Sequence, residues 1–498
     1  MSTQRQGGSD PNMISVGNPA LDEVLGGGLS ANRFYMVQGV PGSGKTTLAL
    51  QFMLEGLKQG ESVLYVTLSE TEEEIRAIAR SHGWSLDGVH VLEIVPSESS
   101  LSAEEQYTVF QPDEVELDET IKFILTEVER RRPARAVFDS LSELRLLAGT
   151  PLRYRRQMLG LKQYFSGRRC TVLVLDDLTG SDDDPQLQSI AHGIIELRQE
   201  TPLYGAEQRR LRVVKYRGMQ FVGGQHDFRI ERGGLRIFPR LVAAGHRGTA
   251  RGGPLSSGVT ALDALLGGGV ERGTSTLLSG APGTGKSTIA LQYAVAAAQR
   301  GERAAVFLFD ESIATLRKRL QGLGIEVEPL LRSGRLTLQQ IDPGELSLGE
   351  FAHIVIRAGS VEQASVVVID SLNGYLNAMP SDRMLQVQLH ELLTRLGQCG
   401  TATLLVSVHR GLIGGSIDTV VDASYLADTV VLLRYFENHG RVCGAISVLK
   451  KRSGEHERTI RAFEIRQGGV SVGPPLEQFQ GVLTGVPTYV GDTLPTTR

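Results

Sequence analysis

The sequence has 498 residues, of which 41% are hydrophobic and 22% charged, with 58 glycines and 19 prolines. This length predicts about two to four domains with substantial cores, and the composition excludes a wholly disordered chain, a collagen or a fibre. The chain holds 52 Lys and Arg against 56 Asp and Glu, so its formal net charge of -4 provides no overall attraction to nucleic acid or anionic lipid.

The cysteine content and the hydropathy pattern indicate a cytoplasmic protein. The three cysteines, Cys170, Cys399 and Cys443, form no CxxC pair and no zinc-ligand spacing, and so few cysteines are typical of a reducing compartment. Residues 1–12 are polar and lack the apolar centre of a signal peptide. No apolar run approaches the roughly 20 residues that span a bilayer, so we expect neither secretion nor membrane insertion.

The second half of the chain repeats the first. The pattern ALD…LGGG at residues 20–28 recurs at residues 261–269, and the match runs without a gap from Gly39 and Gly280 to Glu70 and Glu311. A repeat of this length is a duplicated domain rather than a solenoid. The sequence predicts a first domain at residues 1–245 and a second at 246–498, with a Gly-rich linker at about 239–256.

Short apolar runs alternate with helical segments along each half. In the first half the predicted strands are residues 33–38, 62–68, 136–139 and 171–175, and the predicted helices are 46–59 and 72–82. In the second half the predicted strands are residues 276–279, 304–309, 366–370 and 403–408. Continuous Val, Ile and Leu runs between helices predict an α/β fold, with a mostly parallel sheet flanked by helices in each half. An acidic stretch at residues 98–119 is expected to be a surface loop.

Both halves carry the GxxxxGK[ST] pattern of a phosphate-binding loop, after a predicted strand and before a predicted helix. Glycines let backbone N–H groups surround phosphates, the lysine reaches the outer phosphates, and the Ser or Thr hydroxyl binds Mg²⁺. The N-terminus of the following helix adds positive potential. We therefore predict two nucleotide sites with ATP and Mg²⁺ as cofactors. The predicted binding residues are Gly39, Gly42, Ser43, Gly44, Lys45, Thr46 and Thr47, and then Gly280, Gly283, Thr284, Gly285, Lys286, Ser287 and Thr288.

An aspartate ends a predicted buried strand downstream of each phosphate-binding loop. Such a carboxylate holds the water shell of the metal in nucleotide-hydrolysing proteins of this kind. An aspartate in this place can instead cap the following loop, but its recurrence in both halves favours the metal role. The predicted metal ligands are Thr46 with Asp139 and Ser287 with Asp370.

A glutamate ends the second predicted strand of each half, where it can polarise the attacking water. These residues are Glu70 and Glu311, and the second half has Asp310 as an extra carboxylate. The alternative is a structural role at a helix start, where a carboxylate favours the helix dipole, and both roles are compatible. The pairs at residues 176–177 and 409–410 follow strands at similar places, but they differ between the halves and we assign them no role.

A Lys-x-Arg pair follows a β-like segment near the end of each half. These pairs are Lys215 with Arg217, and Lys450 with Arg452. Alternate residues of a strand share one face, and taken alone such a pair is usually a solvated strand face. Its recurrence favours a catalytic role, in which the cations neutralise charge on the γ-phosphate of a nucleotide held by a neighbouring subunit.

These motifs occur in the same order in both halves, and from about residue 14 to 473 the sequence resembles the KaiC family. The resemblance implies tandem RecA-like P-loop domains in a homohexameric double ring that binds ATP between subunits. It also implies slow ATP hydrolysis in the first domain and Ser/Thr autophosphorylation in the second. The partners it implies are a KaiB-like protein or a histidine kinase and response regulator, while nucleic acid and membrane are not expected.

The sequence departs from that family at two places. The family has a Glu-Glu pair at the base position of both domains, whereas this chain has Ser69-Glu70 and Asp310-Glu311. The family's adjacent Ser-Thr phosphosites correspond to Ser424 and Tyr425, so Ser424 is the candidate phosphosite, with an ordinary loop serine as the alternative. A clock-type tail is not evident after residue 473, and a signalling ATPase and autokinase is favoured over a circadian role.

Two other functions share the same motifs. A RecA- or DnaB-like DNA-dependent ATPase, such as a recombinase or a helicase, usually needs a basic surface or an added DNA-binding element. The net charge of -4 and the lack of a zinc module disfavour this alternative. A scaffold that binds ATP only to assemble is the third possibility, and the intact lysines, aspartates and glutamates argue against it.

Overall fold

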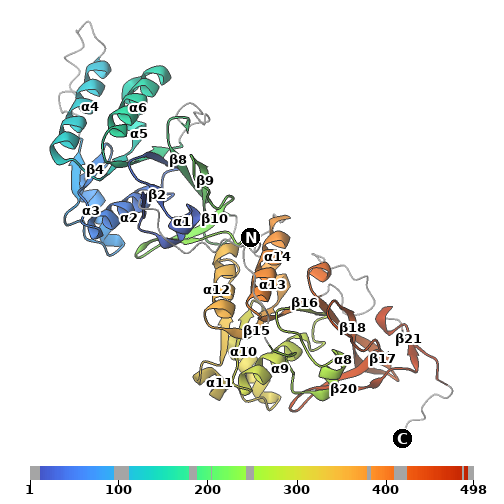
Figure 1. The fold of residues 1–498 in the computed structure, drawn as a ribbon. Helices are drawn as coiled ribbons and strands as arrows, with labels where there is room; N and C mark the ends of the chain where they lie inside the picture. The colour runs from blue at the N-terminus through green and yellow to red at the C-terminus, as the bar shows by residue number, and fades with distance from the viewer. Residues whose placement is uncertain are drawn as a thin grey trace, which may run out of the picture. The chain divides into compact units, whose positions relative to one another are not determined.

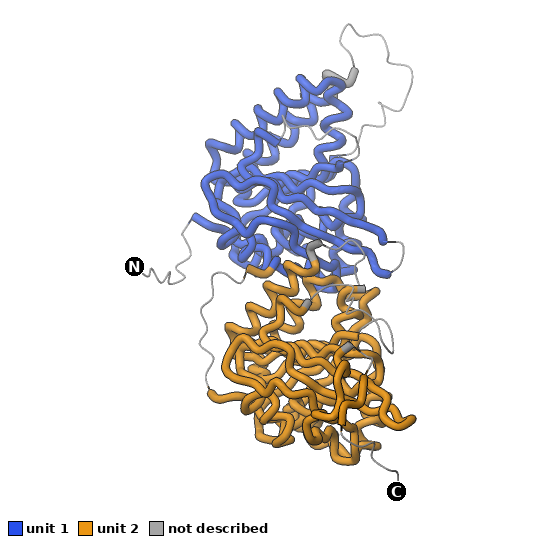
Figure 2. Tube along the Cα trace, turned by 90° about the vertical axis from the view of Figure 1, so that its right-hand side faces the viewer, with its two compact units in different colours: residues 1–240 blue, residues 241–498 orange. Residues whose placement is uncertain are grey.

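The computed structural model describes residues 12–94, 112–178, 188–202, 205–242, 252–377, 383–408, 423–484 and 487–491. The chain divides into two compact units, residues 1–240 and 241–498 (Figure 2). This division falls inside the segment that the sequence predicts as the linker. Among the described residues, no helix is both long and apolar enough to cross a membrane.

The first unit is built on a nine-stranded sheet that is parallel from β8 to β5 and antiparallel from β8 to β11. In sheet order its strands are β11 (Gly234–Phe238), β10 (His226–Glu231), β9 (Gln208–Tyr216), β8 (Gly193–Glu200), β3 (Phe34–Gly39), β7 (Thr171–Asp177), β6 (Arg135–Asp139), β4 (Val63–Thr67) and β5 (His90–Glu93). Its helices are α1 (Pro19–Val24), α2 (Lys45–Lys58), α3 (Glu72–Ser81), α4 (Pro112–Arg131), α5 (Leu141–Ala148) and α6 (Pro151–Ser166). A small separate sheet pairs β1 (Met13–Ile14) with β2 (Leu29–Ser30).

The second unit repeats this topology in a second nine-stranded sheet. Its strands, in sheet order, are β14 (Leu336–Gln340), β13 (Arg303–Leu308), β15 (Ala364–Asp370), β16 (Ala402–Val408), β12 (Ser275–Gly280), β17 (Thr429–Asn438), β18 (Arg441–Lys451), β19 (Arg461–Arg466) and β20 (Gly469–Pro475). Its helices are α8 (Thr260–Leu265), α9 (Lys286–Gln299), α10 (Ile313–Gly322), α11 (Glu328–Arg332), α12 (Leu348–Ser360), α13 (Leu372–Asn377) and α14 (Arg383–Gln398). The short elements η3 (Ala423–Tyr425), β21 (Phe479–Gln480), η4 (Val482–Thr484) and β22 (Thr488–Tyr489) complete it.

Helices cover both faces of each sheet, which explains why the central strands are apolar throughout. In β3, Tyr35 and Val37 pack with α1, α2 and α3, whereas Phe34 and Met36 pack with α4, α5 and α6. Figure 1 shows these two groups of helices on opposite sides of the first sheet. Successive side chains of a strand point to opposite faces, so a sheet buried on both sides needs apolar residues at every position. The predicted α/β fold with tandem, mostly parallel sheets is confirmed.

The prediction of a surface loop at residues 98–119 is wrong for its last part. Residues 95–111 lie outside the described residues, but helix α4 begins at Pro112. One face of α4 is apolar and buried, with residues at helical spacing: Leu117, Ile121, Ile124 and Val128. Acidic residues lie between these apolar positions, so the composition of the segment does not reveal the helix.

Candidate functional site

The first phosphate-binding loop lies at the carboxyl end of the central strand β3, between parallel strands β7 and β8. This edge of an open α/β sheet is where ligands generally bind. Helix α2 begins at Lys45 and has Gly44 as its N-cap, with φ of 99°. A Cβ atom on Gly44 would lie 2.9 Å from Cδ1 of Ile230, so both the backbone angle and the space require glycine here.

Lys45 is buried in the loop and surrounded by oxygen atoms of its own chain. Its Nζ donates to the carbonyls of Gly39 at 2.9 Å and Val40 at 3.0 Å, and it lies 2.6 Å from Oδ1 of Asp177. The hydroxyl of Ser43 is also buried and has no hydrogen-bond partner among the described residues. Buried polar groups normally have hydrogen-bond partners, so this hydroxyl is available to a bound phosphate group.

The predicted metal pair of the first unit is brought together. Thr46 Oγ1 donates to Asp139 Oδ2 at 2.9 Å, and the hydroxyl of Tyr65 donates to the same oxygen at 2.5 Å. Burial raises the pKa of Asp139, and the hydrogen bonds from Tyr65 and Thr46 oppose this shift. A hydroxyl and a carboxylate at the loop provide the oxygen donors that Mg²⁺ prefers.

Glu70 lies at the same edge, just after β4. The hydroxyl of Thr67 donates to the carbonyl of Glu70 at 2.7 Å, and Thr71 caps helix α3 directly after it. Oε2 of Glu70 is buried without a hydrogen-bond partner among the described residues. Burial raises the pKa of Glu70, and the charges of Asp139, Glu74 and Asp177 raise it further. The side chain therefore has the raised proton affinity expected of a general base.

In the second unit, most of the predicted loop residues and all of the predicted metal and base residues line one cavity of about 340 Å³. The cavity is lined by Pro282, Gly283, Gly285, Lys286, Ser287, Thr288, Asp310, Glu311, Arg319, Asp370, Ser371, Val406, Val408 and Ile465. Lys286 Nζ donates to the carbonyl of Ala281 at 2.6 Å, and burial lowers the pKa of Lys286 to about 8. Burial also raises the pKa of Asp370, against a hydrogen bond with Ser287. This pairing repeats that of Thr46 with Asp139.

Both carboxylates at the base position of the second unit are already bound. The hydroxyl of Ser371 donates to Asp310. Arg319, on helix α10, donates to Glu311 through Nε at 3.2 Å and Nη2 at 2.7 Å. Its Nη1 also donates to Thr288 Oγ1 at 3.2 Å. Sequence reasoning did not identify Arg319, although the repeat pairs it with Ile78 and so distinguishes the two halves.

Asp177 is a second residue whose place at the site was not recognised. In the first sheet Gly39 pairs with Asp177, whereas in the second sheet Gly280 pairs with Val408. Among the described residues, the loop lysine therefore forms an ion pair with a carboxylate of the neighbouring strand in the first unit only. The strand registers of the two halves, compared position by position, would have found this difference.

The Lys-x-Arg pairs do not join these sites. They lie at the opposite edge of each sheet, where the parallel strands have their amino ends, whereas the phosphate-binding loops lie at the carboxyl ends. In the first unit, Lys215 Nζ donates to the carbonyl of Gln188 at 2.6 Å, and Arg217 Nη2 to that of Ser189 at 2.5 Å. These residues lie beside the amino end of β8, where Gly193 pairs with Tyr216.

The second unit repeats this arrangement around the candidate phosphosite. Lys450 Nζ donates to the carbonyls of Ser424 and Ala427, each at 2.8 Å. Arg452 Nη2 donates to the carbonyl of Tyr425 at 2.6 Å, and its Nη1 lies 3.4 Å from Asp428 Oδ1. Ser424 is half-buried in η3, ahead of the amino end of β17.

The first unit gathers cations at this edge. A cavity of about 250 Å³ is lined by Asn32, Arg33, Phe34, Lys162, Phe165, Ser166, His192 and Arg217, with no carboxylate among them. Burial lowers the pKa of Lys215, as do the charges of Arg217 and Lys162. We call Arg33, Lys162, Lys215 and Arg217 the cation cluster. Burial and these four charges lower the pKa of His192, which lies among them.

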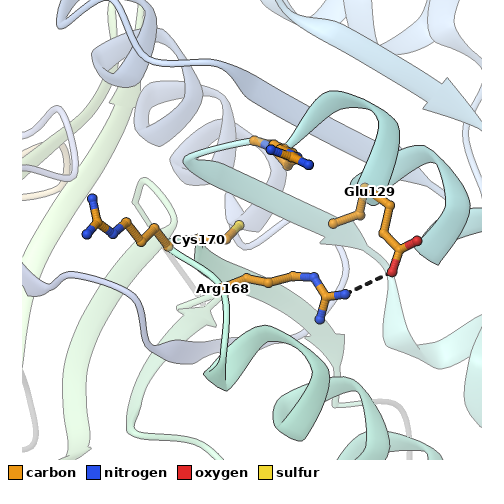
Figure 3. A pocket seen from close by; sticks show the side chains of 7 residues that line it. Glu129, Arg168 and Cys170 are labelled. Carbon is orange, nitrogen blue, oxygen red and sulfur yellow. Dashed lines mark hydrogen bonds and ion pairs between the residues drawn. The ribbon is translucent and has the colours of Figure 1, made fainter.

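A larger cavity of about 500 Å³ lies away from the phosphate-binding loop, at the amino ends of β6 and β7. Figure 3 shows the guanidinium of Arg168 directed at Glu129, 2.8 Å away, so that each charge satisfies the other. Burial raises the pKa of the Cys170 thiol to about 12, which leaves it protonated and unreactive at neutral pH. This cavity has no part in the nucleotide site.

The donor set suits a magnesium ion that depends on its nucleotide. Within the described ranges, no group of three or more His, Cys, Asp or Glu residues is placed to hold a metal. Mg²⁺ usually binds through one or two protein oxygens together with waters and substrate phosphates. The Thr46–Asp139 and Ser287–Asp370 pairs fit that pattern.

Comparison with known proteins matches the family model "ATPase: KaiC" to residues 14–242 and again to residues 255–477. The circadian clock oscillator protein KaiC of Picosynechococcus is 28% identical, over 94% of this chain and 91% of its own. KaiC3, a circadian clock protein of Synechocystis, is 26% identical over 96% and 95%, and KaiC of Synechococcus elongatus is 27% identical over 94% and 91%. With the family model matched once in each unit and the loops, aspartates and glutamates in place, this chain belongs to the KaiC family of ATPases.

Proposed function

We propose that the chain works as a nucleotide-dependent signalling switch in a homohexameric double ring and phosphorylates itself on Ser424. The observation that carries this proposal is the separation of each site into two parts. The loop, the metal ligands and the glutamate lie at one edge of the sheet, and the Lys-x-Arg pair lies at the other. Among the residues that the structure describes, neither edge holds all of these groups.

The size of this separation follows from the strand register. Strand β17 pairs in parallel with β12, from Thr276 opposite Thr429 to Gly280 opposite Leu433. Four residue steps of about 3.3 Å give about 13 Å between the start of this ladder and the phosphate-binding loop. Ser424 precedes that start, so a γ-phosphate in the loop of its own unit is out of reach. The acceptor serine therefore needs the loop of another copy, which is the relation between neighbours in a ring.

Each group then has a role that its position supports. Lys45 and Lys286 bind the outer phosphates, and the hydroxyl–aspartate pairs orient Mg²⁺, which supplies charge stabilisation when it is bound. Glu70 takes a proton from the attacking water, and Asp310 or Glu311 takes one from the acceptor hydroxyl. The Lys-x-Arg pair of an adjacent copy stabilises the charge on the transferred group.

The first test is an incubation of the purified full chain with γ-labelled ATP and Mg²⁺, in which protein-bound label and free phosphate are counted together. We expect label on the protein, and we expect Ser424→Ala to remove most of it. Free phosphate without protein label would identify a plain ATPase and reject the kinase role.

A mixing experiment tests transfer between copies. Lys286→Ala removes the donor loop and keeps the acceptor, while Ser424→Ala does the reverse. When the two variants are mixed with one carrying a size tag, label should appear on the Lys286→Ala chain. Label that never appears there, although the wild-type chain is labelled, would reject transfer between copies.

The proposal extends to a partner that reads the nucleotide state. A KaiB-like protein or a histidine kinase with its response regulator is the class we propose. Binding of a purified KaiB-like protein should differ between the ATP-loaded and ADP-loaded ring by sedimentation, and equal binding would reject that class of partner.

A further inference from the structure

We propose that Arg319 is a positioning residue that restrains Glu311, so that the second site rests with its base held back while the first site does not. This inference rests on the proposed role of Glu70 and Glu311 as bases. It would make the two sites differ in rate through one side chain.

Arg319 holds Glu311 through several hydrogen bonds, and we call this contact between the two residues the clamp. Two of its nitrogens engage both carboxylate oxygens of Glu311, and the third engages Thr288 in the first turn of α9. A two-pronged guanidinium–carboxylate pair fixes direction as well as distance. Glu311 is thus tied to the helix that follows the phosphate-binding loop, with its basic oxygens already occupied.

The first unit supplies an internal control. Ile78 lies eight residues after Glu70, as Arg319 lies eight residues after Glu311, so the first unit has no cation at the matching place. Thr47, which matches Thr288, is instead 3.3 Å from Nε2 of His82. Oε2 of Glu70 has no partner among the described residues. Equivalent glutamates therefore differ in one neighbour.

The groups around Glu311 indicate what would change if its contact with Arg319 were lost. Lys286, Asp310, Asp370 and Arg319 line the same cavity as Glu311. Without the guanidinium, Glu311 would face two carboxylates and one lysine, and a carboxylate in that setting binds a proton more readily. Phosphate oxygens are an alternative partner for a guanidinium, so an arriving nucleotide is the event that would free Glu311.

Swap variants test the clamp in the full chain. Arg319→Ile gives the second site the residue of the first, and Ile78→Arg gives the first site the residue of the second. Phosphate release from the second site is measured in a Lys45→Ala background, and release from the first site in a Lys286→Ala background. Arg319→Lys keeps the charge but loses the two-pronged geometry.

We expect Arg319→Ile to raise phosphate release about three- to fivefold, the effect of one partly exposed ion pair. The acidic limb of its pH–rate profile should move to higher pH, and Arg319→Lys should fall between the two. Ile78→Arg should lower release from the first site. A structural role alone would not move the pH profile.

Two results separate the possible failures. If Glu311→Gln greatly slows release but Arg319→Ile leaves both rate and profile unchanged or slows release, Arg319 does not restrain Glu311. If Glu311→Gln has no effect, the proposed base is wrong and the clamp is rejected with it. Circular dichroism checks that Arg319→Ile keeps its fold. If the fold is lost, Ile78→Arg provides the independent measurement.

Discussion

Replacing Asp177 with valine should tighten ATP binding at the first site. Asp177 lies 2.6 Å from the ammonium of Lys45, with 7% of the lysine side chain and 22% of the aspartate side chain exposed. Burial would raise the pKa of Asp177, but the hydrogen bond and charge of Lys45, with Ser140 and Ser142, lower it overall. The carboxylate is therefore ionised at neutral pH and competes with the phosphates for Lys45.

The magnitude follows from Coulomb's law. A phosphate oxygen on the far side of the lysine would lie roughly 5 Å from the carboxylate, where two like charges repel by about 3 kcal/mol at an effective dielectric constant of 20. Water at the open side of the pair and the loss of a contact that positions Lys45 reduce this gain. We expect a net gain of about 1–2 kcal/mol, or roughly 5- to 30-fold in Kd.

Isothermal titration of the full chain with ATP measures the effect, in a Lys286→Ala background that leaves only the first site. Asp177→Asn is the control that keeps the shape of the side chain. Val408→Asp, measured in a Lys45→Ala background, should weaken binding at the second site by a similar factor. An unchanged or higher Kd for both Asp177 variants would refute the reasoning, because the carboxylate would then not compete with phosphate.

Three further predictions concern charge, packing and backbone. Because burial lowers the pKa of Lys286 to about 8 and a bound phosphate raises it again, ATP binding to the second site at pH 8.5 should take up protons; calorimetry in buffers of different ionisation enthalpy would contradict this if the heat were the same in all of them. Arg135 is fully buried, pairs with Glu61 and donates to the carbonyls of Ser15 and Phe52. Arg135→Ala should therefore lower the unfolding free energy of the first unit by about 3 kcal/mol in urea, and a loss below about 1 kcal/mol would contradict the packing argument. Gly44→Ala should cost about 1–2 kcal/mol of stability because of its positive φ and abolish ATP binding at the first site, and retained binding would show that the loop tolerates a Cβ atom.

The parts of the site that lie within one short segment could be predicted from the sequence. The phosphate-binding loops, the aspartates that end β6 and β15 and the glutamates after β4 and β13 each follow from local spacing. Arg319 and Asp177 could not be assigned in this way, because their importance depends on contacts across a helix and across a strand register. The position of the Lys-x-Arg pairs at the far edge likewise depends on the order of strands in the sheet.

The cation cluster of the first unit has a consequence for assembly. Charges of one sign are costly to remove from water unless opposite charge comes with them. A second copy can therefore cover this edge at low cost only if its surface brings negative charge, and a bound nucleotide is such a surface. In the second unit the place of His192 is taken by Asp428, which lies 3.4 Å from Arg452 and relieves part of the same repulsion. In the proposed ring, association through the first unit should thus depend on nucleotide occupancy and ionic strength more steeply than association through the second.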